Sequence, residues 1–411
     1  MKLYGDGRAA LAGDPRTAER LGWKERRRSR PAPRIVLRPR DGDPLREPWI
    51  APPGWRPLSG AAALWTPARP SARGWTYLAG HPGVDPGLRA IAATPRSGGL
   101  AVGIAGLGRV GGTAAAMLAA LPAARSRLGE LLLHDVDAAN EERWYLELQS
   151  IAAWGNHAVQ PRLRRAAREE LYRSCDVVLF AATAGVPPIG ASGDVRLAQF
   201  APNRAVLAAH LECARAAQFS GLFLVVSDPV ECLALAAFRD SNADAQGRFH
   251  GAGLAPERIA GLALGVMWGR ALAAARAQGW ETSVRRAGGA YGPHSPEVLV
   301  FDDLRRPDAG RSDILSRAAR NGNLVIRELG HLPYVGPAVS SVGLTLPPLL
   351  AGREVLASVF LDGIYFGAPA RLLAGVRPVP RPIGPPVRAR LAELERSLRA
   401  RARDLGLLFE T

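Results

Sequence analysis

The sequence predicts an α/β protein whose βαβ units form a parallel sheet. Two observations support this. From residue 99 onward short apolar runs alternate with helical segments, and the C-terminal region adds further apolar runs and a closing amphipathic helix. Alternation of strands with helices is typical of parallel sheets. We expect three units, which span residues 1–98, 99–238 and 239–411.

The expected elements alternate along the middle of the chain. The predicted strands are 99–108, 130–137, 175–185 and 221–229. The predicted helices are 113–124, 194–218 and 387–406. The last of these has leucines at helical spacing with charged residues between them, which indicates an amphipathic helix that closes the fold.

Residues 1–98 differ in composition from the rest of the chain. They are rich in Arg, Pro and Trp, and hold 18 Lys+Arg against 8 Asp+Glu, so they carry most of the net charge of +16. Their tryptophans argue against a purely disordered tail, and we expect an irregular extension that packs on the main body. Lys2 and Lys24 are the only lysines, so we attribute the charge mainly to a coding bias toward Arg. A basic arm that binds polyanions stays open as an alternative.

Membrane, secretory and metal-binding features are not expected. The apolar stretch "GLFLVVSDPVECLALAAF" is interrupted by charged residues and a proline, which is incompatible with a single membrane span. The first residues lack the apolar core of a secretory signal. The cysteines Cys175, Cys213 and Cys232 have no CxxC spacing, so we interpret them as inert thiols in a reducing cytoplasm, with no metal site.

A glycine-rich motif marks the first strand-to-helix turn. Gly106, Gly108 and Gly111 form GxGxxG between a predicted strand and a predicted helix, which is the context that a dinucleotide site requires. Asp135 ends the second strand, 24 residues past Gly111, where a carboxylate can accept both ribose hydroxyls and repel a 2′-phosphate. We therefore predict that residues 99–238 form a Rossmann-type domain that binds NAD. A glycine-rich turn in another α/β protein is the alternative.

Over roughly residues 100–411 the sequence resembles the lactate/malate dehydrogenase family. The resemblance rests on "DVVLFAATAGVPPIG", "LVVSDPVE", "GLAPERIAGLALGVMWGR" and "LASVFLDGIYFGAPARLLAGVRPV", and on their order and spacing. It implies a Rossmann-type domain followed by a catalytic α+β domain of this family's type. It also implies NAD as cofactor, a 2-hydroxy or 2-keto acid as substrate, and a homo-oligomer.

The resemblance assigns roles to individual residues. It implies that Arg196 polarises the substrate carbonyl from a mobile loop, that Arg270 grips the substrate carboxylate, and that His294 is the acid–base residue. An imidazolium can deliver a proton near neutral pH, and a guanidinium binds a carboxylate bidentately. Contacts with the cofactor are implied for Asn203, Val226 and Asp228, the last of which is also expected in the substrate site.

The sequence departs from the family pattern at three places, one of which is the loop near Pro188 or Ile189, where the family sets side-chain specificity and where this chain is about two residues longer. Met267 stands where the family has the aspartate that orients the histidine, and Asp228 replaces an asparagine that donates to the substrate oxygen. An ionised carboxylate cannot donate a hydrogen bond. Besides a divergent dehydrogenase, a catalytically silent NAD-binding sensor or scaffold therefore stays open, as does an arginine-rich arm for nucleic acid, although we do not expect nucleic acid or a membrane as partner.

Overall fold

The protein is described from a computed structural model of the 411-residue chain. The described residues are 99–121, 127–154, 161–191, 193–247, 253–361, 363–372 and 375–408, and six short strands within 3–77. The short strands are β1 (Leu3–Gly5), β2 (Ala9–Ala12), β3 (Lys24–Arg26), β4 (Ile35–Leu37), β5 (Arg56–Pro57) and β6 (Thr76–Tyr77). The prediction of an extension that packs on the main body falls largely outside the described residues.

A nine-stranded sheet forms the centre of the main body. Its order is β9-β8-β7-β10-β11-β12-β15-β16-β17. The strands are β7 (Leu100–Ala105), β8 (Leu128–His134), β9 (Arg162–Arg165), β10 (Val177–Phe180), β11 (Leu222–Val225), β12 (Ile259–Gly261), β15 (Val355–Leu361), β16 (Ile364–Leu372) and β17 (Val376–Pro378). The first six are parallel, and β15 to β17 continue the sheet in antiparallel pairing. Strands β8 and β9 follow β7 on one side, and β10, β11 and β12 follow on the other side, so the order of strand addition reverses between β7 and β10. Ligands of open α/β sheets bind at such a switch point.

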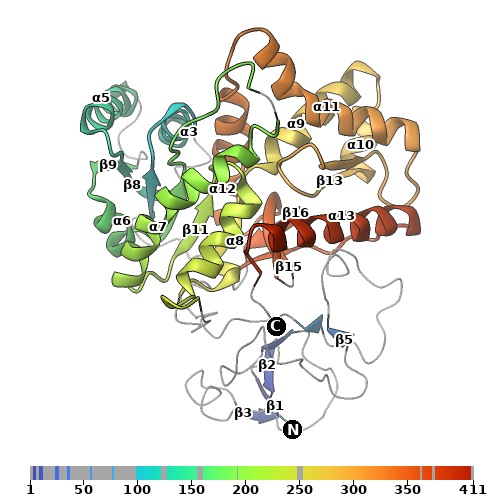
Figure 1. Cartoon of the computed structure of the whole chain (residues 1–411), viewed down its shortest axis with the longest axis horizontal. Helices are drawn as coiled ribbons and strands as arrows, with labels where there is room; N and C mark the ends of the chain where they lie inside the picture. The colour runs from blue at the N-terminus through green and yellow to red at the C-terminus, as the bar shows by residue number, and fades with distance from the viewer. Residues whose placement is uncertain are drawn as a thin grey trace.

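Helices cover the parallel part of the sheet. They are α3 (Arg109–Ala120), α5 (Ala138–Trp154), α6 (Arg168–Ser174), α7 (Phe200–Ala216) and α8 (Val230–Ser241). Figure 1 shows α3 and α5 beside β8, at one end of the molecule. Strands β7, β10 and β11 are apolar and buried on both faces, as parallel strands between helix layers must be.

The second unit extends from the other end of the sheet. It contains α9 (Leu264–Ala277), α10 (Glu281–Ala287), the hairpin strands β13 (Gly289–Tyr291) and β14 (Leu299–Phe301), α11 (Ala309–Glu328), the π-helical segment η5 (Pro337–Gly343), α12 (Leu346–Leu350) and α13 (Pro385–Asp404). A separate apolar cluster between α9, α11 and the hairpin holds this part together. Figure 1 shows α9, α10 and α11 gathered away from α5.

The predicted fold class is confirmed, with two differences in detail. Strand β9, "RLRR", has no apolar alternation because it lies at the sheet edge, and the sequence analysis did not predict it. The sixth parallel strand, β12, lies beyond residue 238, where we expected the first domain to end, and α8 runs through that position. The two units therefore share one sheet. Among the described residues, no helix combines the length and apolarity that a membrane crossing needs.

Candidate active site

A cavity of about 420 Å³ opens where the parallel strands end. The segments that follow β7, β10, β11 and β12 line one side of it, and the loop with His294, helix α11 and segment η5 line the other. Val226, Asp228, Arg196 and His294, all predicted site residues, face this one space. The cavity therefore lies at the topological switch point, between the two units.

The glycine turn forms the cofactor end of the cavity. Gly106 has φ +93°, and a Cβ there would lie 2.5 Å from backbone atoms of Ala182. A Cβ at Gly111 would lie 1.9 Å from the carbonyl oxygen of Gly106, whereas a Cβ at Gly108 would meet no atom within 4 Å. The first and third glycines are thus needed for the turn and its packing, and the second leaves open space for a ligand. This is the division of roles that a dinucleotide turn requires.

Two further features fit a dinucleotide. Helix α3 begins at Arg109 with no side-chain cap, so its first amide groups are available to a pyrophosphate. At the end of β8, Asp135 Oδ2 accepts hydrogen bonds from Leu107 N (2.6 Å) and from Asn140 Nδ2 (3.1 Å). These bonds hold the carboxylate against the glycine turn, at the position where Rossmann-type sites contact the ribose. Among the described residues, no cluster suited to a metal ion is found.

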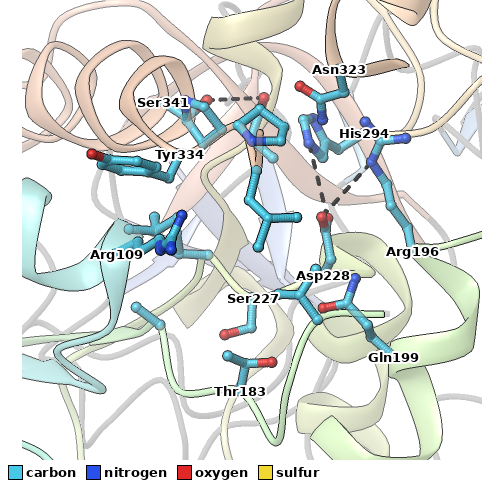
Figure 2. A pocket seen from close by; sticks show the side chains of 18 of the residues that line it. Arg109, Thr183, Arg196, Gln199, Ser227, Asp228, His294, Asn323, Tyr334 and Ser341 are labelled. Carbon is cyan, nitrogen blue, oxygen red and sulfur yellow. Dashed lines mark hydrogen bonds and ion pairs between the residues drawn. The ribbon is translucent and has the colours of Figure 1, made fainter. Parts of the chain in front are cut away.

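The substrate end is built around Asp228. Its Oδ2 lies 3.8 Å from Arg196 Nε, and its Oδ1 lies 4.0 Å from His294 Nε2. Figure 2 shows Asp228 between the other two side chains, with Arg109 and Tyr334 on the opposite side of the cavity. The Asp228 side chain is 26% exposed, whereas its Oδ1 atom is buried.

Several polar atoms at this end have no hydrogen-bond partner among the described residues. They are Arg196 Nε and Nη2, Asp228 Oδ1 and His294 Nδ1. Buried polar groups in folded proteins are almost always satisfied, so a group of unsatisfied ones on residues that line one cavity indicates a polar ligand. Two donors of a guanidinium beside a carboxylate and an imidazole suit a ligand that has both a carboxylate and an oxygen that exchanges a proton.

The protonation states differ from the expectation of an imidazolium. Burial lowers the pKa of His294 well below its ordinary value, and Arg196 and Arg270 lower it further, against a smaller raising effect of the Ala263 backbone. Burial raises the pKa of Asp228 to about 6, although Arg196 opposes the rise. Near neutral pH a neutral histidine is therefore favoured, and the Asp228 carboxyl titrates near pH 6.

Arg270 lies behind the cavity wall instead of lining it. Its Nη1 donates to Ala319 O (3.3 Å) and contacts Met267 Sδ (3.6 Å), and its Nη2 is hydrogen-bonded to Asn323 Oδ1. Burial lowers the pKa of Arg270 to about 10, with a contribution from Arg196. Met267 thus contacts the arginine that was expected to bind the substrate carboxylate, and Asn323 stands between that arginine and the cavity.

Asn203 is buried and connects two loops of the site. Its Nδ2 donates to Asp228 O (2.7 Å), and its Oδ1 accepts from Ala184 N (2.8 Å) and Thr183 Oγ1 (3.0 Å). The side chain does not line the cavity, although the sequence analysis assigned it a cofactor contact. In this structure it positions the segments after β10 and β11, from which Asp228 projects.

Other residues of the site were not predicted. Glu231 on α8 is buried, accepts the backbone N–H of His294 at 3.1 Å and accepts Ser358 Oγ at 2.6 Å, and burial raises its pKa to about 7. On α11, Arg327 lines the cavity and donates to the carbonyls of Pro187 (3.1 Å) and Pro188 (2.6 Å). Glu231 therefore fixes the loop that carries His294, and Arg327 holds the loop after β10 over the site.

One signal in the sequence pointed to α11. Residues 321–323, "NGN", interrupt an otherwise helical stretch, and Asn and Gly are poor helix formers. In the structure a Cβ at Gly322 would lie 2.6 Å from Arg270 Cδ. The glycine makes room for the arginine, and the next residue, Asn323, binds it. An isolated Asn-Gly-Asn within a helical stretch could therefore have marked this segment as part of the site.

No family model matches the chain, and no curated protein resembles it at the level of sequence. Several solved structures resemble the chain in fold. A lactate dehydrogenase from a Medee basin deep-sea metagenome library matches with TM-score 0.59 and 19% identity over 75% of this chain and 99% of that one. The minor L-lactate dehydrogenase of Enterococcus mundtii matches with TM-score 0.60 and 20% identity over 74% and 98%. This chain has the lactate/malate dehydrogenase fold. The malate dehydrogenase of Archaeoglobus fulgidus, solved in complex with NADH, agrees with TM-score 0.60 and 18% identity over 75% and 100%.

Proposed function

We propose that this protein is an NAD-dependent oxidoreductase that interconverts a 2-hydroxy acid and its 2-keto acid. The observation that carries the proposal is the single cavity in which Arg196, Asp228 and His294 meet, next to the glycine turn at Gly108. The fold it shares with lactate and malate dehydrogenases supports the same conclusion. The cofactor, when bound, would supply or accept the hydride.

The residues at the cavity would bind the substrate and the cofactor and exchange the proton. Arg196 brings two unpartnered donors for a carboxylate or a polarised carbonyl, and Asp228 and His294 flank the place where an oxygen can exchange a proton. Gly108 and the first turn of α3 would hold the pyrophosphate, and Asp135 the ribose hydroxyls. Closure of the loop after β10, to which Arg327 is hydrogen-bonded, would exclude water from the cavity.

The cavity favours a monocarboxylic substrate with an apolar or extended side chain. Val186, Val195 and Leu324 line it, and the loop after β10 reads "VPPIG" where malate-type enzymes place a second arginine. Arg327 also lines the cavity but is engaged by the carbonyls of Pro187 and Pro188, so a second carboxylate buried against the apolar residues would be costly. Oxaloacetate as the best substrate of a panel would contradict this specificity.

One observation favours the silent NAD-binding module as a second candidate. Arg270, which should bind the substrate carboxylate, is engaged by α11 and does not line the cavity. NADH oxidation in the presence of a panel of 2-keto acids separates the two functions. The dehydrogenase turns over at least one acid of the panel, whereas the binding module binds NADH and turns over none.

A further inference from the structure

Two side chains that can carry a proton face the same point of the cavity. Oδ1 of Asp228 and Nε2 of His294 are 4.0 Å apart, too far for a hydrogen bond to each other. Oδ1 has no hydrogen-bond partner among the described residues. An oxygen placed between them can lie within hydrogen-bond distance of both atoms, because each such bond needs only about 2.7–3.0 Å. Figure 2 shows both groups at the same end of the cavity.

The surrounding charges decide which of the two carries the proton. They are Asp194, Arg196, Glu231, Arg270 and Arg327. Arg196 and Arg270 both oppose an imidazolium at His294, and burial adds to their effect. Burial and Asp194 both favour the neutral carboxyl at Asp228, whose pKa is raised to about 6. Glu231 is already engaged by His294 N and Ser358 Oγ, so it is not presented to the cavity.

Two of the departures from the expected pattern belong together in this geometry. Met267, at the sequence position where an aspartate that orients the histidine was expected, contacts Arg270 through its thioether. A carboxylate appears instead at Asp228, in front of the imidazole and inside the cavity. The carboxylate of Asp228 thus lies at the cavity, whereas the thioether of Met267 lies against Arg270.

We propose that Asp228 is the general acid and base of this site, and that His294 stays neutral and donates a hydrogen bond to the same substrate oxygen. The inference rests on the proposed function above. In oxidation the substrate O–H bond breaks and its proton passes to Oδ1 of Asp228, while the hydride on C2 leaves to the oxidised nicotinamide and the C=O bond forms. In reduction the same atoms move in the opposite direction, and the Oδ1–H bond of the carboxylic acid breaks.

A pair of nearly isosteric variants of the full-length chain tests the assignment. Asp228→Asn keeps a hydrogen-bond donor and removes the exchangeable proton. His294→Gln places an amide nitrogen near the position of Nε2 and removes the imidazole. With NADH and the best acid of the panel, we expect Asp228→Asn to lose about 10²–10⁴-fold in kcat, the usual contribution of general acid catalysis. We expect His294→Gln to lose only about tenfold, since it can retain a hydrogen bond.

The pH dependence gives a second test. In the wild type, reduction should slow and oxidation should accelerate as the pH rises through about 6, because the first needs the carboxylic acid and the second the carboxylate. The residual activity of Asp228→Asn should show neither the slowing of reduction nor the acceleration of oxidation across this pH range. Near-wild-type turnover in Asp228→Asn together with an inactive His294→Gln would overturn the assignment and make His294 the proton carrier.

A third measurement does not depend on turnover. In protein labelled with γ-¹³C aspartate, the carboxyl resonance that Asp228→Asn removes should titrate near pH 6, and the C2 proton of His294 should not titrate above that pH. Titration of His294 above pH 6 would contradict the proposal. If the wild type binds NADH but converts no acid of the panel, the proposed function fails and the role of Asp228 fails with it. Turnover with the opposite ranking of the two variants refutes only the role of Asp228.

Discussion

The cofactor end and the substrate end of the cavity are built from different parts of the chain. Backbone shape forms the first: Gly106, Gly108 and Gly111 set one turn within six consecutive positions. Side chains from separate loops form the second, with Arg196, Asp228 and His294 meeting from distant points of the sequence. A site made by one backbone turn leaves a local motif, whereas a site made by converging side chains can exchange its chemistry while the fold stays the same.

The largest effect on stability is expected at the glycine turn. Gly111→Ala would place a Cβ 1.9 Å from the carbonyl oxygen of Gly106, so we expect a loss of about 2–3 kcal/mol in the free energy of unfolding, typical of severe overpacking. Gly108→Ala is the matched control, because its Cβ would meet nothing within 4 Å. It should unfold like the wild type and bind NADH at least about tenfold more weakly, since the space that it fills belongs to the pyrophosphate.

Chemical denaturation without cofactor and fluorescence titration with NADH measure these two effects. Equal stability of the two variants would show that the turn is not packed as the structure has it. Unchanged NADH affinity in Gly108→Ala would move the nucleotide away from this turn.

Cofactor choice is expected to depend on Asp135. A carboxylate against the ribose repels a 2′-phosphate, so the wild type should bind NADH at least about tenfold more tightly than NADPH, a difference of about 1.4 kcal/mol. Asp135→Ser should narrow this gap. Arg109 lines the cavity 5.6 Å from the ring of Tyr334, and Arg109→Ala controls for a cation that could compensate a phosphate. Equal affinities of the wild type for NADH and NADPH would show that Asp135 does not contact the ribose.

A smaller effect is expected from restoring a carboxylate behind the histidine. In Met267→Asp the new side chain would lie beside Arg270, which Met267 already contacts, and near His294. We expect the pKa of His294 to rise, with Arg270 limiting the rise by pairing with the carboxylate. The C2 proton resonance of His294 reports this pKa, and Met267→Leu is the apolar control. A variant with the same histidine titration as wild type would show that residue 267 does not face the imidazole.

The smallest effect is expected at the loop over the cavity. Arg327→Ala removes two hydrogen bonds to the carbonyls of Pro187 and Pro188, each worth about 1 kcal/mol or less at this partly exposed position. KM for the keto acid should rise roughly three- to tenfold with little change in kcat, because the loop binds the substrate but does not exchange its proton. Arg320→Ala serves as control, since Arg320 on the same helix pairs with Asp313 and does not line the cavity.

The sequence predicts the cofactor end of the cavity better than the substrate end. The alternating strands and helices and the glycine motif are local patterns, and the fold class is confirmed in the structure. The spacing of the family pattern also located three residues that meet in the cavity: Arg196, Asp228 and His294. Such spacing along the sequence cannot predict where the end of a long side chain lies. Arg270 has the expected spacing, yet Gly322 and Asn323 on α11 direct its guanidinium away from the cavity.

The protonation of the site was also beyond local patterns. The pKa of His294 depends on its burial and on two arginines from different elements, and that of Asp228 depends mainly on burial. Neither pKa follows from spacing, so an imidazolium was expected where burial and the two arginines favour a neutral imidazole. The same holds for Glu231, whose role depends on Ser358 and on the backbone of His294, both distant in sequence.

Transfer of a labelled hydride tests the central claim of a dehydrogenase most directly. The protein is incubated with NADH deuterated at C4 of the nicotinamide and with a panel of monocarboxylic 2-keto acids, and the products are analysed by mass spectrometry. The account predicts a 2-hydroxy acid that carries one deuterium on C2. NADH that binds tightly while no acid of the panel acquires deuterium would contradict the account and leave a nucleotide-binding module.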